Sequence, residues 1–280
     1  MSQIQVSIIL VNYNGGDVIL DCLASIFQHL TAPSFEVIVV DNDSRDRSPD
    51  RIEQKFPQVT LLRQSDNLGF GTANNVGARQ AQGRYLFLLN SDTLMQQAIL
   101  PTLIQKLESA PDIGVVGPRL LNPDGSFQLS TAYEIGLWGE WKTLQEVRKY
   151  RQPANRPTLA QQYCTDRFVD IIVGAAMLMR RSHFLDFGGF DETFFMYFEE
   201  SDLCQRFRDA GYRLLYTPEV SLVHIGGFSV AQVAGKMATE YRRSQRYYYQ
   251  KHRPSWEQWV LHRYLALKQW RQRRRNPPSR

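Results

Sequence analysis

The chain has 280 residues, 43% hydrophobic and 12% aromatic, a composition that fills a sizeable core and excludes a disordered protein. Its net charge of +5 is uneven, because residues 242–280 hold twelve Lys and Arg against one acid, Glu257, and carry +11, whereas the remaining 241 residues carry −6. An acidic body is poorly suited to holding phosphate by bulk charge alone, so we expect any phosphate bound there to need a cation.

The cysteines and the amino-terminal sequence indicate the compartment. Cys22, Cys164 and Cys204 are scattered and form no CxxC pair, which favours a reducing setting over zinc or disulfide chemistry. The first residues show no basic stretch followed by an apolar signal region, and no apolar run approaches about 18 residues. We therefore expect a cytoplasmic protein that is neither secreted nor membrane-spanning.

The first 120 residues alternate between strand-like and helix-like segments. Apolar, largely β-branched runs predict strands at 6–11, 36–40, 59–63 and 84–89. Segments with helical spacing or helix-compatible composition lie at 18–29, 48–56, 72–82 and 97–109. This alternation predicts an open α/β sheet whose ligand lies at the carboxyl edge of the strands, with 1–120 as a nucleotide-binding half.

Beyond residue 118 the pattern loosens. Residues 122–166 are rich in turn residues and contain Trp138 and Trp141, so we expect a mobile or family-variable excursion there. Four further elements are then predicted: a strand at 168–180, a helix at about 199–210 ended by Gly211, and short strands at 213–217 and 221–224.

Two polar clusters follow predicted strands. Asp41-Asn42-Asp43 and Asn90-Ser91-Asp92 would be neighbours on one sheet edge, where oxygens can read a nucleotide while a carboxylate holds a divalent metal on a diphosphate. Capping of the following turns and helices is the commoner use of such residues. Spacing alone leaves both explanations open.

A glycine-punctuated segment from Asn67 to Gly77 leads into a helix and could bring backbone amides close to a phosphate. It is not the dinucleotide-binding fingerprint, because Asn74 stands where the third glycine should be. A tight turn that needs positive φ explains the glycines, including Gly69, about equally well.

Three acids, Glu199, Glu200 and Asp202, begin a predicted helix, which the helix dipole partly explains. The preceding aromatic run, 194–198, indicates that this helix start is not freely exposed. Carboxylates crowded beside apolar rings tend to have raised pKa values suited to a general base. His224, at the end of a strand, is by itself more often a structural histidine than a metal ligand.

Taken in order, these segments resemble the motif set of family 2 inverting glycosyltransferases with the GT-A fold. Within the family, the chain is most similar to the rhamnosyltransferase-like branch that builds bacterial surface polysaccharides. The segments that carry the resemblance are 6–14, 40–44, 67–77, 88–92, 173–177, 188–195 and 199–203. One such motif is weak, but the ordered set is strong and covers about residues 4–250.

The resemblance implies an α/β, GT-A (Rossmann-like) domain over 1–250, with a mixed, mostly parallel sheet flanked by helices. Residues 1–120 would form its nucleotide-binding half and 121–250 its acceptor-binding and catalytic half. Residues 251–280 would then be a separate basic, aromatic tail with a C-terminal amphipathic helix.

The resemblance also implies a metal site. Asn90-Ser91-Asp92 occupies the place of the family's DxD motif, so Asp92 would bind Mn²⁺ or Mg²⁺ on the diphosphate of a nucleotide-sugar. His224 matches a histidine that completes this site in some relatives. Because Asn90 replaces the first acid of the motif, we expect metal binding to rest on Asp92 and His224 and to be weaker.

Further roles follow position by position. Glu200 falls on the second acid of the family's paired-acid motif, the general base, with Glu where many relatives have Asp. Asp41 and Asn42 match positions that contact the nucleobase, and Asn67 and Gly69 are expected at the same donor site. Three more residues match a loop near the transferred sugar and the acceptor: Gly188, Gly189 and Asp191.

The reaction implied is a metal-dependent, inverting transfer from dTDP-rhamnose or a UDP-sugar to a saccharide or lipid-linked acceptor. The cation would serve as Lewis acid for the leaving diphosphate, and Glu200 would take the proton of the attacking hydroxyl. One alternative is a sugar-nucleotide nucleotidyltransferase, disfavoured because no glycine- and basic-rich triphosphate loop lies near the amino terminus. The other is a non-catalytic, membrane-associated scaffold with a degenerate site.

The tail predicts a helix over 255–275 with Ser255 as its cap. At about 100° per residue its apolar residues gather on one side, which Arg263 interrupts and from which Leu261 and Leu265 stray. The members of this side are Trp256, Trp259, Val260, Tyr264, Leu267 and Trp270. Nearby cations are Lys268, Arg271, Arg273, Arg274 and Arg275.

Two occupants explain this apolar side about equally well. It suits an anionic membrane surface, where a lipid-linked acceptor would be found, and would place the protein peripherally on the inner face of the cell membrane. It could instead pack on the body or on a second subunit of a homodimer. Nucleic acid is disfavoured by the acidic body and by the absence of a reading motif.

Overall fold

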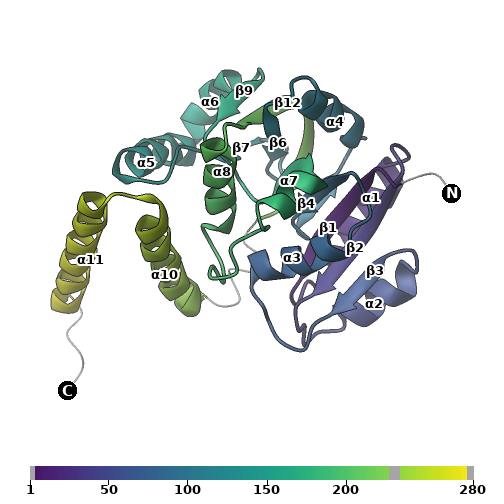
Figure 1. Ribbon diagram of the computed structural model, residues 1–280, viewed down its shortest axis with the longest axis horizontal. Helices are drawn as coiled ribbons and strands as arrows, with labels where there is room; N and C mark the ends of the chain where they lie inside the picture. The colour runs from purple at the N-terminus through teal and green to yellow at the C-terminus, as the bar shows by residue number, and fades with distance from the viewer. Residues whose placement is uncertain (1–3, 227–233, 276–280) are drawn as a thin grey trace.

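A mixed β-sheet forms the centre of the computed structural model, which describes residues 4–226 and 234–275 (Figure 1). Its main path runs β3 (Thr60–Arg63), β2 (Phe35–Asp41), β1 (Val6–Asn12), β4 (Tyr85–Leu89), β11 (Ala176–Arg180), β6 (Ile113–Leu121), β12 (Arg213–His224) and β5 (Thr93–Met95). At its margin β7 (Phe127–Gln128) pairs with β6, and β9 (Arg167–Val169) pairs with β12. A separate two-stranded sheet joins β8 (Thr131–Ala132) to β10 (Ile171–Ile172).

Most strands of the main path run in one direction. The strands β3, β2, β1 and β4 are parallel, β11 is antiparallel between β4 and β6, and β12 is parallel to β6. The register pairs Asn12 at the end of β1 with Asp41 at the end of β2. The carboxyl ends of the parallel strands therefore share one edge, as expected for an open α/β sheet.

Helices cover both faces of this sheet (Figure 1). One face carries α1 (Val18–His29), α2 (Ser48–Lys55) and α4 (Leu100–Glu108), and the other carries α3 (Phe70–Gln80), α7 (Arg181–Asp186) and α8 (Glu199–Asp209). In β1, Val6, Ile8 and Leu10 face the first layer and Ile9 faces the second. A strand buried on both faces reads as a continuous apolar run, which is why its position could be predicted.

Two strand predictions in the second half were wrong. Residues 168–180 form three short strands, β9, β10 and β11, because each pairs with a different partner strand. Residues 213–217 and 221–224 form one strand, β12, with an irregular register between Thr217 and Ser221. The predicted helix end is confirmed: Gly211 follows α8 at φ +88°.

The segment 122–166, read from the sequence as a turn-rich, mobile or family-variable excursion, is largely helical. It contains α5 (Leu137–Arg151), the short 3₁₀ helix η1 (Pro153–Asn155) and α6 (Arg156–Gln162). None of the residues of α5 is buried, so no apolar stripe marks the helix in the sequence. Leu159 and Tyr163, in contrast, pack on Phe127 and Tyr216 and attach the segment to the sheet.

Two C-terminal helices, α10 (Ala234–His252) and α11 (Ser255–Arg275), lie side by side next to α8 and α5 (Figure 1). Tyr248 and Tyr249 of α10 share an apolar cluster with Leu261 and Leu265 of α11. Phe194 and Phe198, which precede α8, complete this cluster. The two helices are thus packed on the body at the start of α8.

The orientation of α11 corrects one interpretation. Leu261 and Leu265, expected to stray from the apolar side, are 3% and 4% exposed and pack on the body. Trp256 and Trp259, members of the expected apolar side, are 62% and 60% exposed. The body therefore does not cover the tryptophan side. The side chains of Arg273, Arg274 and Arg275, and residues 276–280, lie outside the described part.

No helix within residues 4–226 and 234–275 is both long enough and apolar enough to cross a membrane.

Candidate active site

A buried polar cluster lies where β1 and β2 end. The side-chain amide of Asn12 donates hydrogen bonds to Oδ1 of Asp41 (2.7 Å) and to Oγ of Ser48 (2.9 Å). The backbone N–H of Ser44 donates to the other oxygen of Asp41 (3.3 Å). Asp41 is only 4% exposed and orders the loop after β2. Its contact with a nucleobase stays a prediction.

Asn42 fastens the glycine-punctuated segment to the same edge. Its Nδ2 donates to Oδ1 of Asn67 (2.8 Å) and to the carbonyl of Gly69 (3.2 Å), and its Oδ1 accepts the N–H of Leu68 (2.9 Å). Gly69 has φ +83°, and a Cβ there would lie 2.2 Å from the carbonyl oxygen of Phe195. The glycine is therefore required by a close backbone approach, whatever ligand binds nearby.

Asn90, Asp92 and His224 converge where β4 ends and β12 ends. Nε2 of His224 lies 3.3 Å from Oδ1 of Asp92 and 3.4 Å from Nδ2 of Asn90. The pairing of β5 with β12, which sets Thr93 opposite His224, brings these distant parts of the sequence together. Ser91, within the motif, is half-buried. The structure thus assembles the two expected metal ligands.

Gln128 orients the ring of His224. Its Nε2 donates to the carbonyl of His224 (3.1 Å) and to Oδ1 of Asn122 (3.0 Å), which directs its Oε1 toward Nδ1 of His224 (2.7 Å). Oε1 is an acceptor, so Nδ1 is the donor in this hydrogen bond, and Nε2 is the ring nitrogen directed toward Asp92. A histidine oriented by a hydrogen bond on its far nitrogen is a prepared metal ligand.

These groups fit a hard divalent cation that is shared with a nucleotide. Oδ1 of Asn90 is buried and has no hydrogen-bond partner in the described chain, so it is available as a further oxygen ligand. Within residues 4–226 and 234–275 no three His, Cys, Asp or Glu side chains gather into a complete metal site. Mg²⁺ sites on nucleotides commonly use one or two carboxylates, with substrate phosphates and waters supplying the remainder.

Glu199 and Glu200 begin α8 and have raised pKa values. Burial raises the pKa of Glu199 well above its usual range, and the charge of Glu200 adds to this effect. Burial also raises the pKa of Glu200, which remains half-buried, whereas Glu199 is 4% exposed. Glu200 is therefore the member of the pair that can both meet a substrate and accept a proton.

The segment between β10 and β11 joins Glu200 to the metal site. A Cβ on Gly174 would lie 3.5 Å from Cβ of Glu200, so the acid stands directly over this glycine. The next residue, Ala175, accepts a hydrogen bond from the backbone N–H of Asn90 (2.9 Å). The candidate base and the candidate cation site are thus attached to adjacent residues of one segment.

Strained backbone precedes the two acids. Tyr197 and Phe198 have φ values of +69° and +73°, a region that bulky side chains rarely adopt. Ser244 of α10 donates to the carbonyl of Met196 (2.8 Å), and Phe198 is buried in the cluster formed with α10 and α11. The C-terminal helices therefore help to hold this conformation and the direction in which α8 begins.

Asp202, the third acid of the helix start, has a structural role. It is fully buried and binds Nε2 of His252 (2.6 Å), Nζ of Lys251 (2.7 Å) and Nε of Arg206 (2.8 Å). Burial alone raises the pKa of Asp202, but the hydrogen bond from His252 and the charges of Arg206 and Lys251 outweigh it and lower the pKa. This carboxylate docks α10 onto α8.

The loop at 188–191, expected near the sugar and the acceptor, is held from two sides. Asn75 of α3 exchanges two hydrogen bonds with the backbone of Phe190, and a Cβ on Gly189 would lie 2.4 Å from Oδ1 of Asn75. Asp191 accepts from Tyr247 (2.9 Å) and pairs with Lys251 (2.6 Å) of α10. Gly188, at φ +78°, has open space around its Cβ position. Sugar contact by this loop stays a prediction.

Three site residues gave no usable signal in the sequence. Gln128 lies inside the segment expected to be irregular, and its partner His224 is distant in the chain. Asn75 was part of the matched segment 67–77, but its hydrogen bond to the loop at Phe190 follows only from the three-dimensional packing. Gly174 was part of a matched segment, but its position under Glu200 follows only from the three-dimensional packing.

The sequence of the chain is similar to known rhamnosyltransferases. The N-acetylglucosaminyl-diphospho-decaprenol L-rhamnosyltransferase of Mycobacterium tuberculosis is 28% identical over 285 residues, covering 93% of this chain and 90% of that protein. Rhamnosyltransferase WbbL of Escherichia coli K12 is 28% identical over 164 residues, covering 56% of this chain and 60% of that protein.

Solved structures with the GT-A fold resemble this one. The mannosyltransferase PcManGT of Pyrobaculum calidifontis, in complex with GDP-Man and Mn²⁺, has a TM-score of 0.61 at 18% identity, covering 90% of this chain and 65% of that chain. TarS 1–349 of S. aureus has a TM-score of 0.56 at 17% identity, covering 87% and 69%. At this low sequence identity the similarity is evidence for the fold alone, and it confirms the predicted GT-A fold.

The family model described as Glycosyl transferase family 2 matches residues 7–187. This range includes both strand-end clusters, the glycine-punctuated segment, and Gly174 and Ala175, which contact Glu200 and Asn90. It sets aside the nucleotidyltransferase and scaffold alternatives. With its sheet topology, its paired acids and its likeness to an L-rhamnosyltransferase over 93% of its length, the chain belongs to glycosyl transferase family 2 and is a glycosyltransferase.

Proposed function

We propose that this glycosyltransferase moves rhamnose, with inversion, from dTDP-rhamnose to a saccharide carried on a lipid diphosphate in surface polysaccharide synthesis. The full-length likeness to an L-rhamnosyltransferase whose named acceptor is a diphospho-decaprenol supports both donor sugar and acceptor class. A UDP-sugar is the second donor to be tested.

Asp92, His224 and Asn90 would hold Mn²⁺ or Mg²⁺ at the donor diphosphate. PcManGT with GDP-Man and GalNAc-T7 with UDP were both solved with Mn²⁺, which supports a cation in this class. When bound, the cation supplies Lewis-acid stabilisation of the charge that develops on the departing diphosphate.

Glu200 would act as the general base. A hydroxyl oxygen of the acceptor forms a bond to the anomeric carbon as the bond to the diphosphate oxygen breaks, and the hydroxyl proton passes to the Glu200 carboxylate. The observation that carries this proposal is the raised pKa of a half-buried acid held over Gly174, next to the residue that anchors Asn90.

Substitution of Glu200 tests the proposal. Glu200→Gln keeps the shape but removes the proton acceptor, so transfer from dTDP-rhamnose should fall by about 10²- to 10⁴-fold with donor binding retained. Glu200→Asp should recover part of the rate, and Glu53→Gln, at an exposed acid of α2 on the other face of the sheet, should leave it unchanged. The product is measured as released dTDP.

The pH profile provides a second readout of the same group. Because burial raises the pKa of Glu200, wild-type kcat/KM should fall on the acid side at a pH above the usual Glu value of about 4.3, as the base becomes protonated. A Glu200→Gln variant with the wild-type rate and profile would reject Glu200 as the base.

A further inference from the structure

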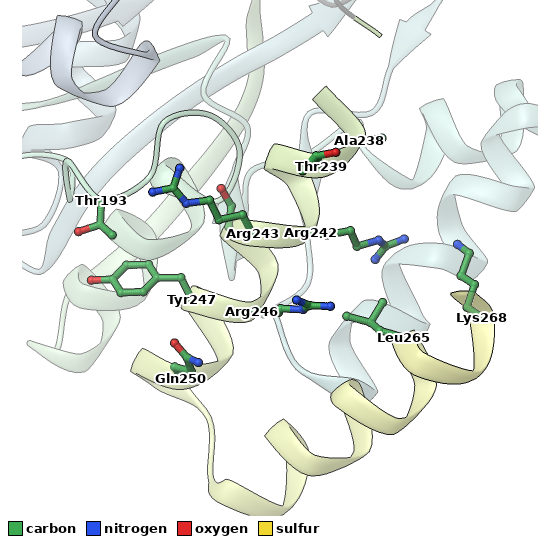
Figure 2. Close-up of a pocket in the computed structure, with 11 residues that line it drawn as sticks. Thr193, Ala238, Thr239, Arg242, Arg243, Arg246, Tyr247, Gln250, Leu265 and Lys268 are labelled. Atoms are coloured by element: carbon green, nitrogen blue, oxygen red, sulfur yellow. The ribbon is translucent and has the colours of Figure 1, made fainter. Parts of the chain in front are cut away.

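A basic pocket lies between α10 and α11, outside the candidate active site (Figure 2). Its volume is about 710 Å³. Figure 2 shows Arg242 and Arg246 of α10 directed toward Lys268 and Leu265 of α11, whereas Arg243 is directed toward Thr193. Among the described residues that line the pocket, the charged ones are all cations: Arg242, Arg243, Arg246 and Lys268.

These cations are poorly compensated by the protein. Neither Arg246 nor Lys268 has an ion-pair or hydrogen-bond partner among the described residues. Arg242 donates to the neutral Oε1 of Gln245 (2.6 Å), and Arg243, itself exposed, pairs only with the half-buried acid Glu240 at 3.6 Å. Other cations of α10, such as Lys251, are in contrast paired with acids of the body. Three like charges directed into one space favour an anionic occupant.

The pocket adjoins the part of the molecule where an acceptor must bind. Tyr247, which lines it, donates to Asp191 of the loop expected near the acceptor (2.9 Å). Ser244, also in its lining, donates to the carbonyl of Met196, four residues before Glu200 (2.8 Å). One wall of the pocket is thus bonded to the chain segment that positions the proposed base.

The exposed side of α11 agrees with a lipid-borne ligand. Leu265 and Lys268 face the pocket, whereas Trp256 and Trp259 lie on the opposite side of the helix at about 100° per residue. An α11 seated in a membrane interface by its tryptophans would hold the pocket roughly one helix diameter, about 10 Å, toward the solvent. Lipid phosphate groups lie in this headgroup layer.

We infer that the pocket between α10 and α11, given the proposed transfer to a lipid-linked saccharide, binds the acceptor's diphosphate through Arg242, Arg246 and Lys268. Guanidinium groups bind phosphate oxygens in a bidentate manner, and the lysine adds a point charge. The saccharide then extends from the pocket toward Glu200, and the prenyl chain extends toward the membrane.

Isothermal titration with farnesyl diphosphate in EDTA tests this assignment, because chelation of metals prevents the probe from binding at the donor cation site. Arg246→Gln/Lys268→Gln should weaken the Kd at least about tenfold. Arg263→Gln is the matched control: its cation lies on α11 too, but over the ring of Trp259 on the opposite side of the helix. All three positions are exposed, so folding should be unaffected.

Titrations with farnesol and with inorganic pyrophosphate distinguish the contribution of the prenyl chain from that of the diphosphate. Farnesol should not bind, and pyrophosphate should bind more weakly than farnesyl diphosphate with the same sensitivity to the double variant. The assignment is overturned if wild type does not bind farnesyl diphosphate, if the double variant binds it equally, or if pyrophosphate binds as tightly.

The donor site provides an independent check. Stabilisation by dTDP with Mn²⁺ should depend on Asp92 and should be the same in the double variant. Retained donor binding with unchanged farnesyl diphosphate binding in the double variant would reject only the pocket. Absent donor binding with a normal pocket response would reject only the proposed transfer reaction.

Discussion

Adjacent acids at the start of α8 differ because their surroundings differ. Glu199 and Glu200 lie among apolar groups, and burial raises their pKa values, whereas cations from two helices lower the pKa of Asp202. A helix dipole acts on all three and cannot separate them. Because α10 packs against α8, Asp202 is held in ion pairs with Lys251 and His252, whereas Glu199 and Glu200 make no such pairs in the described chain.

Asp202→Asn should therefore destabilise the fold rather than remove a catalytic group. The amide keeps the shape but leaves Lys251 and Arg206 without their buried counter-charge, so the free energy of unfolding in urea should fall by about 3 kcal/mol at pH 7. Asp209→Asn, an exposed acid of the same helix, should change it by less than about 0.5 kcal/mol.

Lowering the pH should remove the difference in unfolding free energy between wild type and Asp202→Asn. The folded-state pKa of Asp202 is lowered, so its stabilisation is present above the unfolded value of about 3.9 and is lost as the pH falls through the lower folded value. A difference between wild type and Asp202→Asn that stays constant to the lowest pH at which both fold would contradict the charge argument.

At the scale of elements, the start of α3 is fixed by backbone contact with the loop before α8. The N–H of Phe70 donates to the carbonyl of Phe195 (3.0 Å), and Gly69 leaves no room for a side chain. The donor edge and the segment leading to Glu200 are thereby coupled. A substitution at residue 69 should therefore disturb both the donor edge and the segment that leads to Glu200.

Gly69→Ala should lower the free energy of unfolding by about 3 kcal/mol, because it adds a steric clash to the cost of positive φ. Gly125→Ala is the matched control: its φ of +77° is similar, but nothing lies within 4 Å of its Cβ position, so only about 1–2 kcal/mol is expected. Both are measured by urea unfolding. Equal effects would show that the contact with Phe195 is unimportant.

The elements also explain what could be predicted from the sequence. β1 and β4 were predicted because strands buried on both faces are continuously apolar, and the polar residues at their ends then fixed the ligand edge. α5 could not be predicted, because no buried stripe marks it. The sequence left open which side of α11 packs on the body, because the aromatic cluster that receives Leu261 and Leu265 forms only in the tertiary fold. Gln128 required the tertiary fold.

At the scale of the whole molecule, the cations of the C-terminal region fall into two groups: some form ion pairs with acids of the body, and others are exposed on α11. Lys251 and Arg253 are used to pair α10 with Asp191, Asp202 and Glu134 of the body. Arg263 instead accompanies exposed tryptophans on α11. An aromatic and basic outer side suits an anionic bilayer, and we propose peripheral membrane association through this side, with a second subunit as the competing occupant.

Flotation with vesicles tests this surface. Wild type should bind vesicles that contain phosphatidylglycerol, less at high salt because exposed charges are screened, and Trp256→Ser/Trp259→Ser/Trp270→Ser should reduce the bound fraction about tenfold. Phe168→Ser, 51% exposed on β9, should have no effect. Wild type that stays unbound and elutes as a dimer, with the triple variant as a monomer, would favour the second subunit.

The central claim is that Asp92 and His224 form a cation site for a nucleotide-sugar donor, and a thermal-shift titration tests it most directly. Wild type, Asp92→Ala and Asp112→Ala are each titrated with dTDP, UDP and GDP, with and without Mn²⁺. Asp112 pairs with Arg213 at the opposite edge of the sheet and serves as the control.

A nucleotide at 100 times its Kd should add about 2.7 kcal/mol of stability. We expect dTDP to stabilise wild type and Asp112→Ala only with Mn²⁺, and Asp92→Ala not at all. Stabilisation that is independent of Mn²⁺, or that persists in Asp92→Ala, would contradict the proposed cation site, and no stabilisation by any of the three nucleotides would contradict the donor assignment itself.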